Sequence, residues 1–269
     1  MARAITKLGG QALAIYPAGG TNGQMLRQLL DQEGIPQEVV DINDETRENL
    51  TVAEDDSGQQ YRFVMPGPDI SEDERDKLAS AVTKQCERAD YFVLSGSLPG
   101  QVPRDFYADL AAKVKRCNSK VIVDTSGEPL RQSLGEGIYL FKPNLRELGD
   151  MVDGQPEGDE QIVAAVRRLI SDGAVEIGLV SLGAGGALMV SAEQALHYRS
   201  PTVKIESKVG AGDSMVAGLV LALSRGEDIA EAVRFGVAAG AAAVMTPGSE
   251  LCRREDTERL VEQVSSQAV

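Results

Sequence analysis

The chain has 269 residues, of which 42% are hydrophobic and 25% are charged, a composition that indicates a globular protein and excludes disordered and fibrous classes. Its formal net charge of −14 disfavours a surface for nucleic acid or for an anionic membrane, because such binding depends on neutralising phosphates. No apolar run reaches the roughly 20 residues of a membrane span, and the first residues, MARAITKLGG, lack the apolar core of a signal peptide, so we expect a cytoplasmic protein.

Segment 46–67 is the first that predicts strands. Its sequence, TRENLTVAEDDSGQQYRFVMPG, contains two β-prone runs joined by a polar turn with Gly58, which is typical of an antiparallel hairpin. The hairpin is either an edge of a sheet or a cover over a site, and both interpretations stay open. Ser71 and Glu74 follow in a capping-box pattern that predicts the start of a helix.

From Tyr91 onward, short apolar runs alternate with longer segments of helical periodicity. The expected strands are YFVLSG, VIVDTSG, IYLFKPN and IGLVSLG, and the expected helices between them include PRDFYADLAAKVKRC and EQIVAAVRRLISDG. Right-handed crossovers between such strands give a mostly parallel sheet with helices on both faces, so we predict an α/β doubly wound fold. From Asp213 to the end we expect helices and no strand. No linker or repeat divides the chain, which predicts a single domain over 1–269.

Polar motifs follow the expected strands at the end where a doubly wound sheet binds its ligands. Such sheets place ligands beyond the carboxyl ends of their strands. The motifs found there are SGSLPG, DTSGE, KPNLRE and SLGAGG. The chemistry of the protein is therefore expected at this edge of the sheet.

The stretch KVGAGDSMVAG, residues 208–218, places an aspartate between glycines and an apolar helical run. Gly210 and Gly212 leave the backbone open to close approach, and amides at a helix N-terminus bind anions. Asp213 has two interpretations. It is the N-cap of the helix, worth about 1 kcal/mol, or it accepts a proton from an attacking hydroxyl while the amides hold a phosphoryl group.

Other familiar sites are excluded by the residues present. No Gly-Lys pair exists for a phosphate-binding loop of the Walker type, and Met215 and Leu188 stand where a dinucleotide fingerprint needs glycine. The single histidine, His197, has no second ligand or nucleophile in sequence reach, so we expect it to fill space. The three cysteines are widely spaced, and we expect them to be reduced and structural.

A set of motifs together resembles a known family. The chain carries, in collinear order along nearly its whole length, the motifs YRFVMPG, SGSLPG, VDTSGE, KPNLRE, VSLGAGGAL, GAGDSMVAG and RFGVAAGAAA. They resemble the PfkB (ribokinase-like) family of carbohydrate kinases, and YRFVMPG with RFGVAAG narrows the resemblance to its 6-phosphofructokinase branch. The resemblance implies a ribokinase-like fold in which segment 46–67 is the lid hairpin.

The resemblance also implies an activity. It predicts a kinase that uses ATP and Mg²⁺ to phosphorylate a ketohexose phosphate, with fructose 6-phosphate to fructose 1,6-bisphosphate as the main expectation. Tagatose 6-phosphate or fructose 1-phosphate as acceptor, and an impaired protein that only binds nucleotide, are the alternatives; a dehydrogenase is disfavoured by the missing fingerprint. Family members dimerise through the lid, which predicts a homodimer for the full-length form.

The resemblance assigns roles at the GAGD turn and at the N-x-x-E motif. Asp213 matches the catalytic base, and the anion hole comprises Gly210, Ala211 and Gly212. Asn144 and Glu147 match a motif that helps to place magnesium and phosphates, although without the other motifs a helix start with an exposed glutamate would be the favoured interpretation. The expected nucleotide contacts are Lys142, Asn144, Ser181, Gly183, Gly186 and Gly240, and the expected magnesium contacts, through water, are Glu147 and Asp124.

Several of these assignments have a simpler alternative. Asp124 is also suited to forming a turn, and small residues such as Gly240 more often serve close packing. For the sugar phosphate, the resemblance assigns Arg62, whose guanidinium suits a phosphate, and Ser97. A solvated strand arginine and a serine in a glycine-rich turn are the corresponding alternatives.

The chain departs from the family in two places. Family members have a first strand, a sugar-binding aspartate and further lid strands before the equivalent of Ala2, so we expect an N-terminally truncated reading frame in which sugar affinity suffers more than nucleotide affinity. Lys208 stands where the family usually has Ser or Thr. It either reaches a phosphate or points to solvent, and the sequence leaves both open.

Overall fold

The computed structural model describes residues 1–54, 60–152 and 154–269. The chain divides into two compact units, each described by itself below. The first unit contains Met1–Gln11, Gln85–Ser97 and Arg104–Val269, and the second contains Ala12–Lys84 and Leu98–Pro103. Gly58, expected in the hairpin turn, lies outside the described residues.

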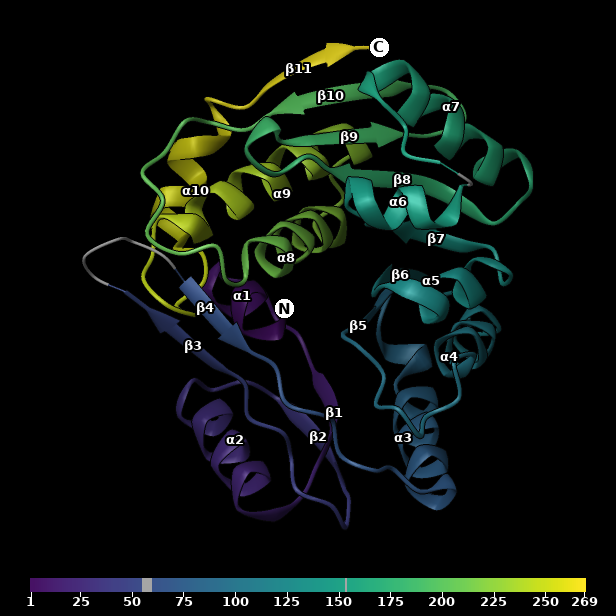
Figure 1. The fold of residues 1–269 in the computed structure, drawn as a ribbon, viewed down its shortest axis with the longest axis vertical. Coiled ribbons are helices and arrows are strands. Elements are labelled where there is room, and N and C mark those ends of the chain that lie inside the picture. Colours follow the sequence, from purple (N-terminus) through teal and green to yellow (C-terminus); the bar gives the residue numbers. More distant parts are fainter. Residues whose placement is uncertain (55–59, 153) are drawn as a thin grey trace. The chain divides into compact units, whose positions relative to one another are not determined.

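The first unit contains a seven-stranded sheet in the order β11-β10-β9-β8-β7-β6-β5 (Figure 1). Strands β5 to β8 are parallel, and β9, β10 and β11 continue the sheet antiparallel. The strands are β5 (Tyr91–Ser95), β6 (Lys120–Asp124), β7 (Ile138–Phe141), β8 (Val175–Ser181), β9 (Ala187–Val190), β10 (Ala195–Arg199) and β11 (Ser265–Ala268). The four strands expected between Tyr91 and Ser181 are confirmed.

Strand β11 corrects the expectation that no strand follows Asp213. It pairs antiparallel with β10 at the sheet edge, with Leu196 opposite Ala268. All four of its residues are exposed, and its sequence, SSQA, has neither an apolar run nor β-branched residues. The sequence of β11 therefore has no periodic pattern from which a strand could be predicted.

Helices cover both faces of this sheet. The crossovers from β5 to β8 all step in one direction, and right-handed crossovers of that kind place their helices on one face. Those helices are α4 (Phe106–Lys115), α5 (Gly127–Leu134), α6 (Leu145–Met151) and α7 (Gly158–Ser171). The other face carries α8 (Ala211–Ser224), α9 (Ile229–Val244) and α10 (Arg254–Val261) (Figure 1). Helix α1 (Ala2–Lys7) packs on α8. The short 3₁₀ helices are η1 (Cys86–Arg88) and η2 (Gly183–Gly185).

The core lies where the parallel strands are buried on both sides. Ile122, Leu140 and Leu179 are each 0% exposed, as expected for strands covered on both faces. Helix α8 is buried along Ser214–Leu223 because small residues let α9 approach closely. A Cβ added at Gly236 would lie 2.7 Å from the Met215 carbonyl oxygen. The alanine- and glycine-rich sequence of α9 thus fixes the position of α8.

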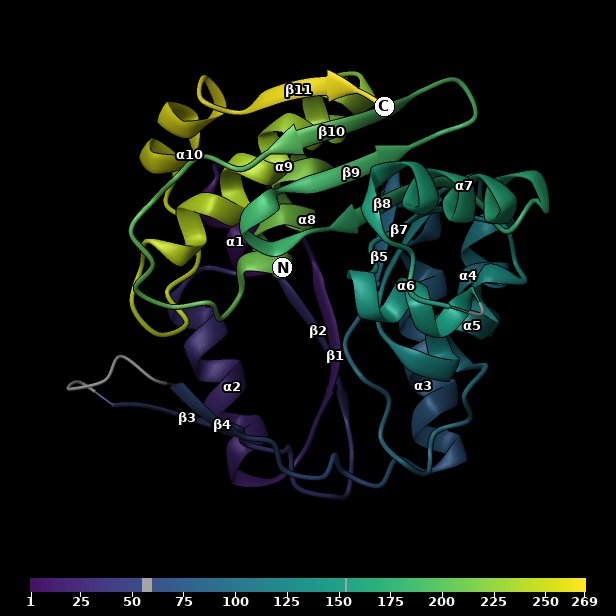
Figure 2. The same ribbon diagram turned by 45° about the horizontal axis from the view of Figure 1, so that its top comes forward.

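The second unit is built from a parallel pair of strands and a hairpin. Strand β1 (Ala14–Ala18) pairs parallel with β2 (Gln37–Asp41), joined by α2 (Gly20–Gln32). Strand β3 (Leu50–Ala53) pairs antiparallel with β4 (Gln60–Phe63), and the two lie side by side in Figures 1 and 2, which confirms the predicted hairpin.

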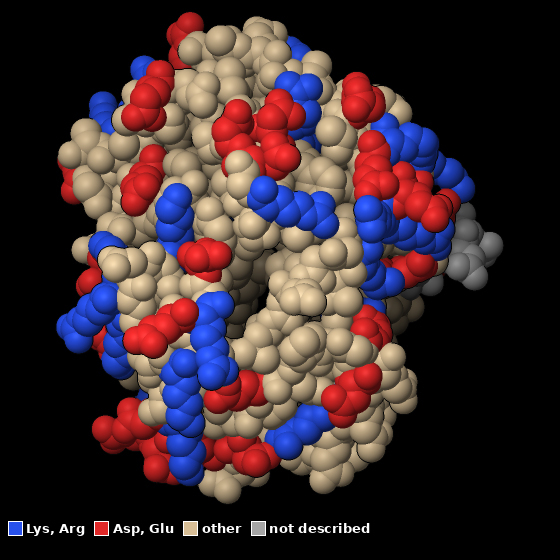
Figure 3. All heavy atoms as spheres, turned by 180° about the vertical axis from the view of Figure 1, so that it is seen from behind, with Lys and Arg blue, Asp and Glu red and all other residues tan. Residues whose placement is uncertain are grey.

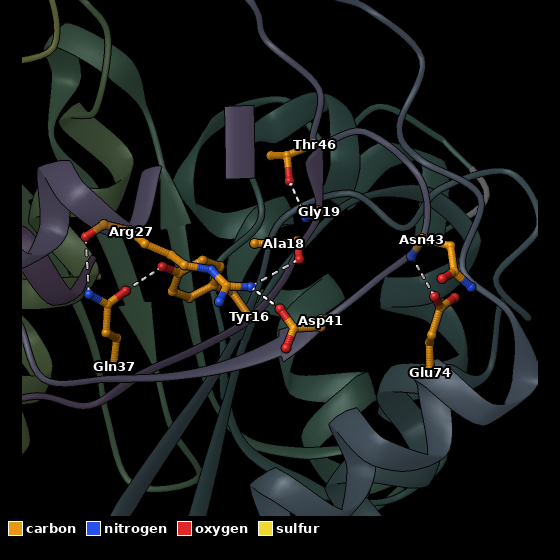
Figure 4. Close-up of polar contacts among 9 residues, drawn as sticks. All are labelled: Tyr16, Ala18, Gly19, Arg27, Gln37, Asp41, Asn43, Thr46 and Glu74. Atoms are coloured by element: carbon orange, nitrogen blue, oxygen red, sulfur yellow. Dashed lines mark hydrogen bonds and ion pairs between the residues drawn. The ribbon is translucent and has the colours of Figure 1, made fainter. Parts of the chain in front are cut away.

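Helix α3 (Glu72–Lys84) begins with the predicted capping box. The amide of Ser71 donates to Glu74 Oε2 at 2.7 Å, and the Glu74 amide donates to Ser71 Oγ at 3.4 Å. Glu74 is 5% exposed and also accepts the Asn43 amide at 2.7 Å (Figure 4). Hydrogen bonds from Ser71, first from its side chain and then from its amide, and from Asn43 lower the Glu74 pKa.

Further polar contacts hold the ends of β1 and β2 (Figure 4). The Gly19 amide donates to Thr46 Oγ1 at 3.0 Å, and the Arg27 guanidinium pairs with Asp41. On the face shown in Figure 3, Lys and Arg side chains are interspersed with Asp and Glu. Within the described ranges, no helix is long and apolar enough to span a bilayer. Cys86, Cys117 and Cys252 are free thiols, as expected.

Candidate active site

An ion pair stands at the carboxyl end of the parallel strands of the first unit. Asp124 ends β6 and Lys142 directly follows β7, so their side chains leave adjacent strands at the same edge. Lys142 Nζ lies 3.1 Å from Asp124 Oδ1, and the two side chains are 9% and 18% exposed. A cation and a carboxylate are therefore held together with little access to water.

Two further carboxylates act on Asp124. Burial raises the Asp124 pKa, Lys142 lowers it, and the negative charges of Asp213 and Glu147 raise it again. Asp213 and Glu147 therefore both lie within electrostatic reach of Asp124, the partner of Lys142. The structure thus brings together Asp124, Lys142, Glu147 and Asp213, which come from three separate segments of the sequence.

The first turn of α8 presents free backbone amides beside this lysine. Gly210 is the N-cap, with φ of 79°, a left-handed conformation that favours glycine. The amides of Ala211, Gly212 and Asp213 follow it and have no acceptor within the helix. A Cβ added at Gly212 would lie 3.5 Å from Lys142 Nζ, so the ammonium lies alongside this turn.

The interpretation of Asp213 as the N-cap is wrong. The helix begins at Ala211, which makes Asp213 its third residue and leaves capping to Gly210. Asp213 is half-buried in the first turn. Helix capping therefore does not account for the aspartate at this position.

Asn144 and Glu147 form a complete capping box at the start of α6. The Glu147 amide donates to Asn144 Oδ1 at 2.9 Å, and the Asn144 amide donates to Glu147 Oε2 at 2.9 Å. The alternative of a helix start is thus correct as structure, although Glu147 is half-buried rather than exposed. Asn144 also forms an isolated parallel bridge with Ser181, whose amide donates to the Pro143 carbonyl at 2.9 Å. Asn144 and Ser181, which are both predicted nucleotide contacts, are therefore neighbours.

The glycine-rich turn after β8 is exposed at Gly183 and buried at Gly186. Both have positive φ, 59° and 99°. At Gly183 the space for a side chain is open, whereas a Cβ at Gly186 would lie 1.9 Å from the Tyr198 carbonyl oxygen. Only Gly183 of the two presents its backbone to the surface.

Gly240 is buried between α9 and the first turn of α8. A Cβ added there would lie 3.3 Å from the Ala211 carbonyl oxygen and 3.4 Å from Met215 Cβ. Its observed contacts are those of close packing, the simpler alternative. It packs against the first turn of α8.

The SGS turn after β5 is held next to Asp124. The Gly96 amide donates to the Asp124 carbonyl at 3.2 Å, and Tyr107 Oη donates to the Ser95 carbonyl at 2.9 Å. Burial, with a smaller effect of the Asp124 charge, raises the pKa of Tyr107 to about 12. Ser97 follows this turn and is exposed. Tyr107 was missed because it stands inside an ordinary helical pattern.

Arg62 and Lys208 are both exposed. Arg62 lies on β4 of the second unit, opposite Thr51, and is exposed. Lys208 belongs to the first unit and is exposed just before the α8 turn. The interpretation of Lys208 as a solvated side chain fits this exposure.

The acidic residues at this site suit a metal ion that keeps its waters rather than one ligated entirely by protein side chains. Among the described residues, no three Asp, Glu, His or Cys side chains gather as a ready-made metal site. Mg²⁺ usually keeps several waters and binds one or two carboxylates together with substrate phosphates. Asp124 and Glu147, each within electrostatic reach of the other, fit that kind of donor set.

Comparison with known proteins identifies close relatives. A family model described as "pfkB family carbohydrate kinase" matches residues 1–256. ATP-dependent 6-phosphofructokinase isozyme 2 of Escherichia coli (strain K12) is 42% identical over 97% of this chain and 84% of its own. 1-Phosphofructokinase of Borreliella burgdorferi is 31% identical over 97% and 83%. The tetrameric inhibited form of phosphofructokinase-2 from Escherichia coli superposes with a TM-score of 0.91 at 40% identity, over 97% of this chain and 84% of that one.

Proposed function

The chain belongs to the pfkB family of carbohydrate kinases, and from this premise we propose that it transfers a phosphoryl group from ATP to a ketohexose phosphate, with fructose 6-phosphate as the acceptor and fructose 1,6-bisphosphate as the product. One observation carries the proposal for the site: Asp213 stands in the first turn of α8, where the backbone amides and Lys142 meet. A proton acceptor and a phosphate-binding turn are thereby supplied by one element.

The phosphates of ATP bind at the start of α8. Backbone amides and the partial positive charge of a helix N-terminus favour an anion there. Lys142, which lies alongside Gly212, adds a full positive charge. Asn144, Ser181 and Gly183 bind the nucleotide from the adjoining loops, and Gly240 supports the site by packing.

Asp213 acts as the general base on the sugar hydroxyl. Its carboxylate accepts the proton of the attacking hydroxyl, while the amides stabilise negative charge on the transferring group. This division answers the problem of an acid placed in an anion site, because the charge that develops meets dipoles rather than the carboxylate. Positioning and electrostatics supply most of the acceleration in such transfers.

Asp124 and Glu147 hold Mg²⁺ through water. When bound, the ion neutralises charge on the phosphates of ATP. Lys142 lowers the Asp124 pKa against the larger effect of burial, which favours the ionised state that a cation needs. Glu147 accepts the Asn144 amide with Oε2, and its other carboxylate oxygen would be the one to face the hydrated ion.

In the first unit, Ser97 is suited to contact a hydroxyl of the acceptor. In the second unit, Arg62 of the lid hairpin is suited to its phosphate. A guanidinium suits the phosphate of a sugar phosphate, because it donates two parallel hydrogen bonds. The comparison with a 1-phosphofructokinase keeps fructose 1-phosphate as a second acceptor to be tested.

The hairpin also provides a face for a homodimer. Leu50 pairs opposite Phe63 and Val52 opposite Tyr61, so these four apolar side chains share one face. Each is between 43% and 56% exposed. Burying this face against a second copy would remove it from water. Sedimentation analysis should show a dimer that Phe63→Asp dissociates; a parent that sediments as a monomer contradicts this part of the proposal.

The proposed activity is tested by ADP release coupled to a dehydrogenase readout. Fructose 6-phosphate, tagatose 6-phosphate and fructose 1-phosphate are compared at equal concentration with ATP and Mg²⁺. Fructose 6-phosphate should give the highest kcat/KM. Release with fructose 1-phosphate alone would reassign the acceptor, and ATP binding without release for any sugar would favour a noncatalytic nucleotide-binding protein.

A further inference from the structure

His197 connects two elements to the glycine-rich turn after β8. It lies on β10 between Leu188 of β9 and Gln267 of β11, and its side chain is 14% exposed. Its Nδ1 is 2.6 Å from Asp159 Oδ2, and its Nε2 is 3.2 Å from the Gly185 carbonyl oxygen. Both partners are hydrogen-bond acceptors, so a protonated ring nitrogen that faces either of them donates to it. The expectation that this histidine merely fills space is therefore too simple.

Asp159 is suited to hold the ring in this orientation. It is the second residue of α7, where the helix dipole favours a negative charge. Its carboxylate fixes Nδ1, which aims Nε2 at the turn. The imidazole thus has one anchored side and one that acts on the backbone of residue 185.

The turn is held by its own backbone hydrogen bonds and by strand β10. Residues 183–186 are GAGG, and Gly183 and Gly186 have positive φ, so the free chain has many alternative conformations. Backbone bonds join the Leu182 amide to the Gly186 carbonyl at 2.9 Å, and the Gly185 and Gly186 amides to the carbonyls of residues 182 and 183, each at 3.1 Å. Strand β10 adds both the backbone of residue 198, packed against Gly186, and the side chain of His197.

We propose that His197 is a positioning residue that holds the 183–186 turn in the shape that receives the nucleotide. This inference rests on the proposed function, because it takes the turn as part of the ATP site. Without the Nε2 bond, the turn would have to be ordered when ATP binds, and that conformational entropy would be subtracted from the affinity. The chemical step depends on Asp213 of α8 and would be little affected.

A matched pair of variants separates the two bonds of the ring. The side-chain amide of His197→Gln reaches the position of Nε2 and keeps a donor for the Gly185 carbonyl. The shorter His197→Asn reaches only the position of Nδ1 and keeps the contact with Asp159. Both remove the ring, so a difference between them reports the bond to the turn.

Steady-state kinetics and hydrogen exchange supply the readouts. His197→Asn should raise the KM for ATP about fivefold, the usual effect of one lost hydrogen bond, with kcat and the KM for the sugar phosphate unchanged. His197→Gln should stay within about twofold of the parent. Amide exchange in 182–186, measured without ATP, should accelerate in the Asn variant and not in the Gln variant.

Two results overturn the inference. Equal KM for ATP in the Asn variant and the parent removes the effect on the nucleotide, and equal exchange in the two variants removes the effect on the turn. Calorimetric titration of the parent with ATP distinguishes failure of the proposed function, since a parent that binds no ATP refutes the nucleotide site itself, whatever the variants show.

Discussion

Lys142 Nζ and Asp124 Oδ1 lie 3.1 Å apart at the ends of adjacent parallel strands, and both side chains are largely withdrawn from water. Such a pair differs from a surface ion pair, which contributes about 0 to 1 kcal/mol. Removal of one member of a buried pair leaves the other uncompensated, and that loss is about 3 to 5 kcal/mol for full burial.

Lys142→Met is therefore expected to lower the free energy of unfolding by about 2 to 3 kcal/mol, somewhat less than for full burial because Asp124 keeps some exposure. Urea unfolding measures this loss. Because burial already raises the Asp124 pKa, loss of the cation should raise it further. The control is the double variant Lys142→Met with Asp124→Asn, which removes the stranded charge and should recover part of the stability. Strictly additive effects of the two substitutions would contradict a coupled pair.

Glu74 makes the stability of the second unit depend on pH, because folding lowers its pKa, whereas burial raises that of Asp124. Hydrogen bonds from Ser71 and from the Asn43 amide lower its pKa from the ordinary value of 4.5. A carboxyl whose pKa is lowered by folding stabilises the protein fully above its unfolded pKa, and this contribution disappears as pH falls through the folded pKa. The parent should thus lose stability below about pH 4.5 as Glu74 takes up a proton.

Glu74→Gln tests this directly. It should lower the free energy of unfolding by about 1 to 2 kcal/mol at pH 7, because several donors lose a charged acceptor. The difference between parent and variant should shrink as pH falls below 4.5. Urea unfolding at a series of pH values measures both effects, and a difference that stays constant down to the acid limit would show that Glu74 does not titrate in this way.

The sequence predicted those parts of the molecule that depend on local pattern. Strands β5 to β8 were predictable because each is an apolar run buried on both faces, and the hairpin because a polar turn joins two β-prone runs. Strand β11 was not, because SSQA carries no pattern and forms a strand only through its pairing with β10. Long-range pairing of this kind leaves no trace in the segment itself.

The candidate site divides in the same way. Asp213 and its flanking glycines could be found because conformation and chemistry are both local to one turn. The α8 cap could not be assigned correctly, since the left-handed conformation of Gly210 decides where the helix begins. His197 and Tyr107 act on the backbone of distant turns, at separations of 12 and 11 residues, and nothing in their immediate sequence predicts those contacts.

Gly210 and Gly226 provide a matched test of the proposed anion-binding turn. Both have positive φ, 79° and 87°. A Cβ at Gly210 would lie 2.3 Å from Leu251 Cδ2, whereas one at Gly226 would meet no atom of the described residues within 4 Å. Alanine at either position adds backbone strain of about 1 to 2 kcal/mol. Only Gly210→Ala also displaces a buried side chain beside the α8 amides.

Gly210→Ala should therefore lose more stability than Gly226→Ala and should also bind ATP more weakly. Gly226→Ala should lose stability alone, because residue 226 follows the far end of α8. Urea unfolding and ATP titration measure the two effects separately. Equal ATP affinity in both alanine variants would exclude the 210–212 turn from the nucleotide site.

Asp213→Asn separates the chemical role of this residue from its structural one. As a negative charge in the first turn of α8, Asp213 stabilises the helix by about 0.3 to 1 kcal/mol. As a general base it contributes about 10²- to 10⁴-fold to turnover, or roughly 3 to 5 kcal/mol of barrier. The catalytic effect is thus the larger one, and the two are measured by different experiments.

The Asn variant should lose turnover by about 10²- to 10⁴-fold while its free energy of unfolding falls by less than about 1 kcal/mol. Its KM for ATP should change little, because the amides and Lys142 remain in place and the repulsion between Asp213 and the phosphates is relieved. Lys142→Met is the reference for the opposite pattern, weaker ATP binding together with lower stability. Turnover near that of the parent in the Asn variant would remove Asp213 from the proton transfer, and the base would then have to be sought among the other carboxylates around Lys142.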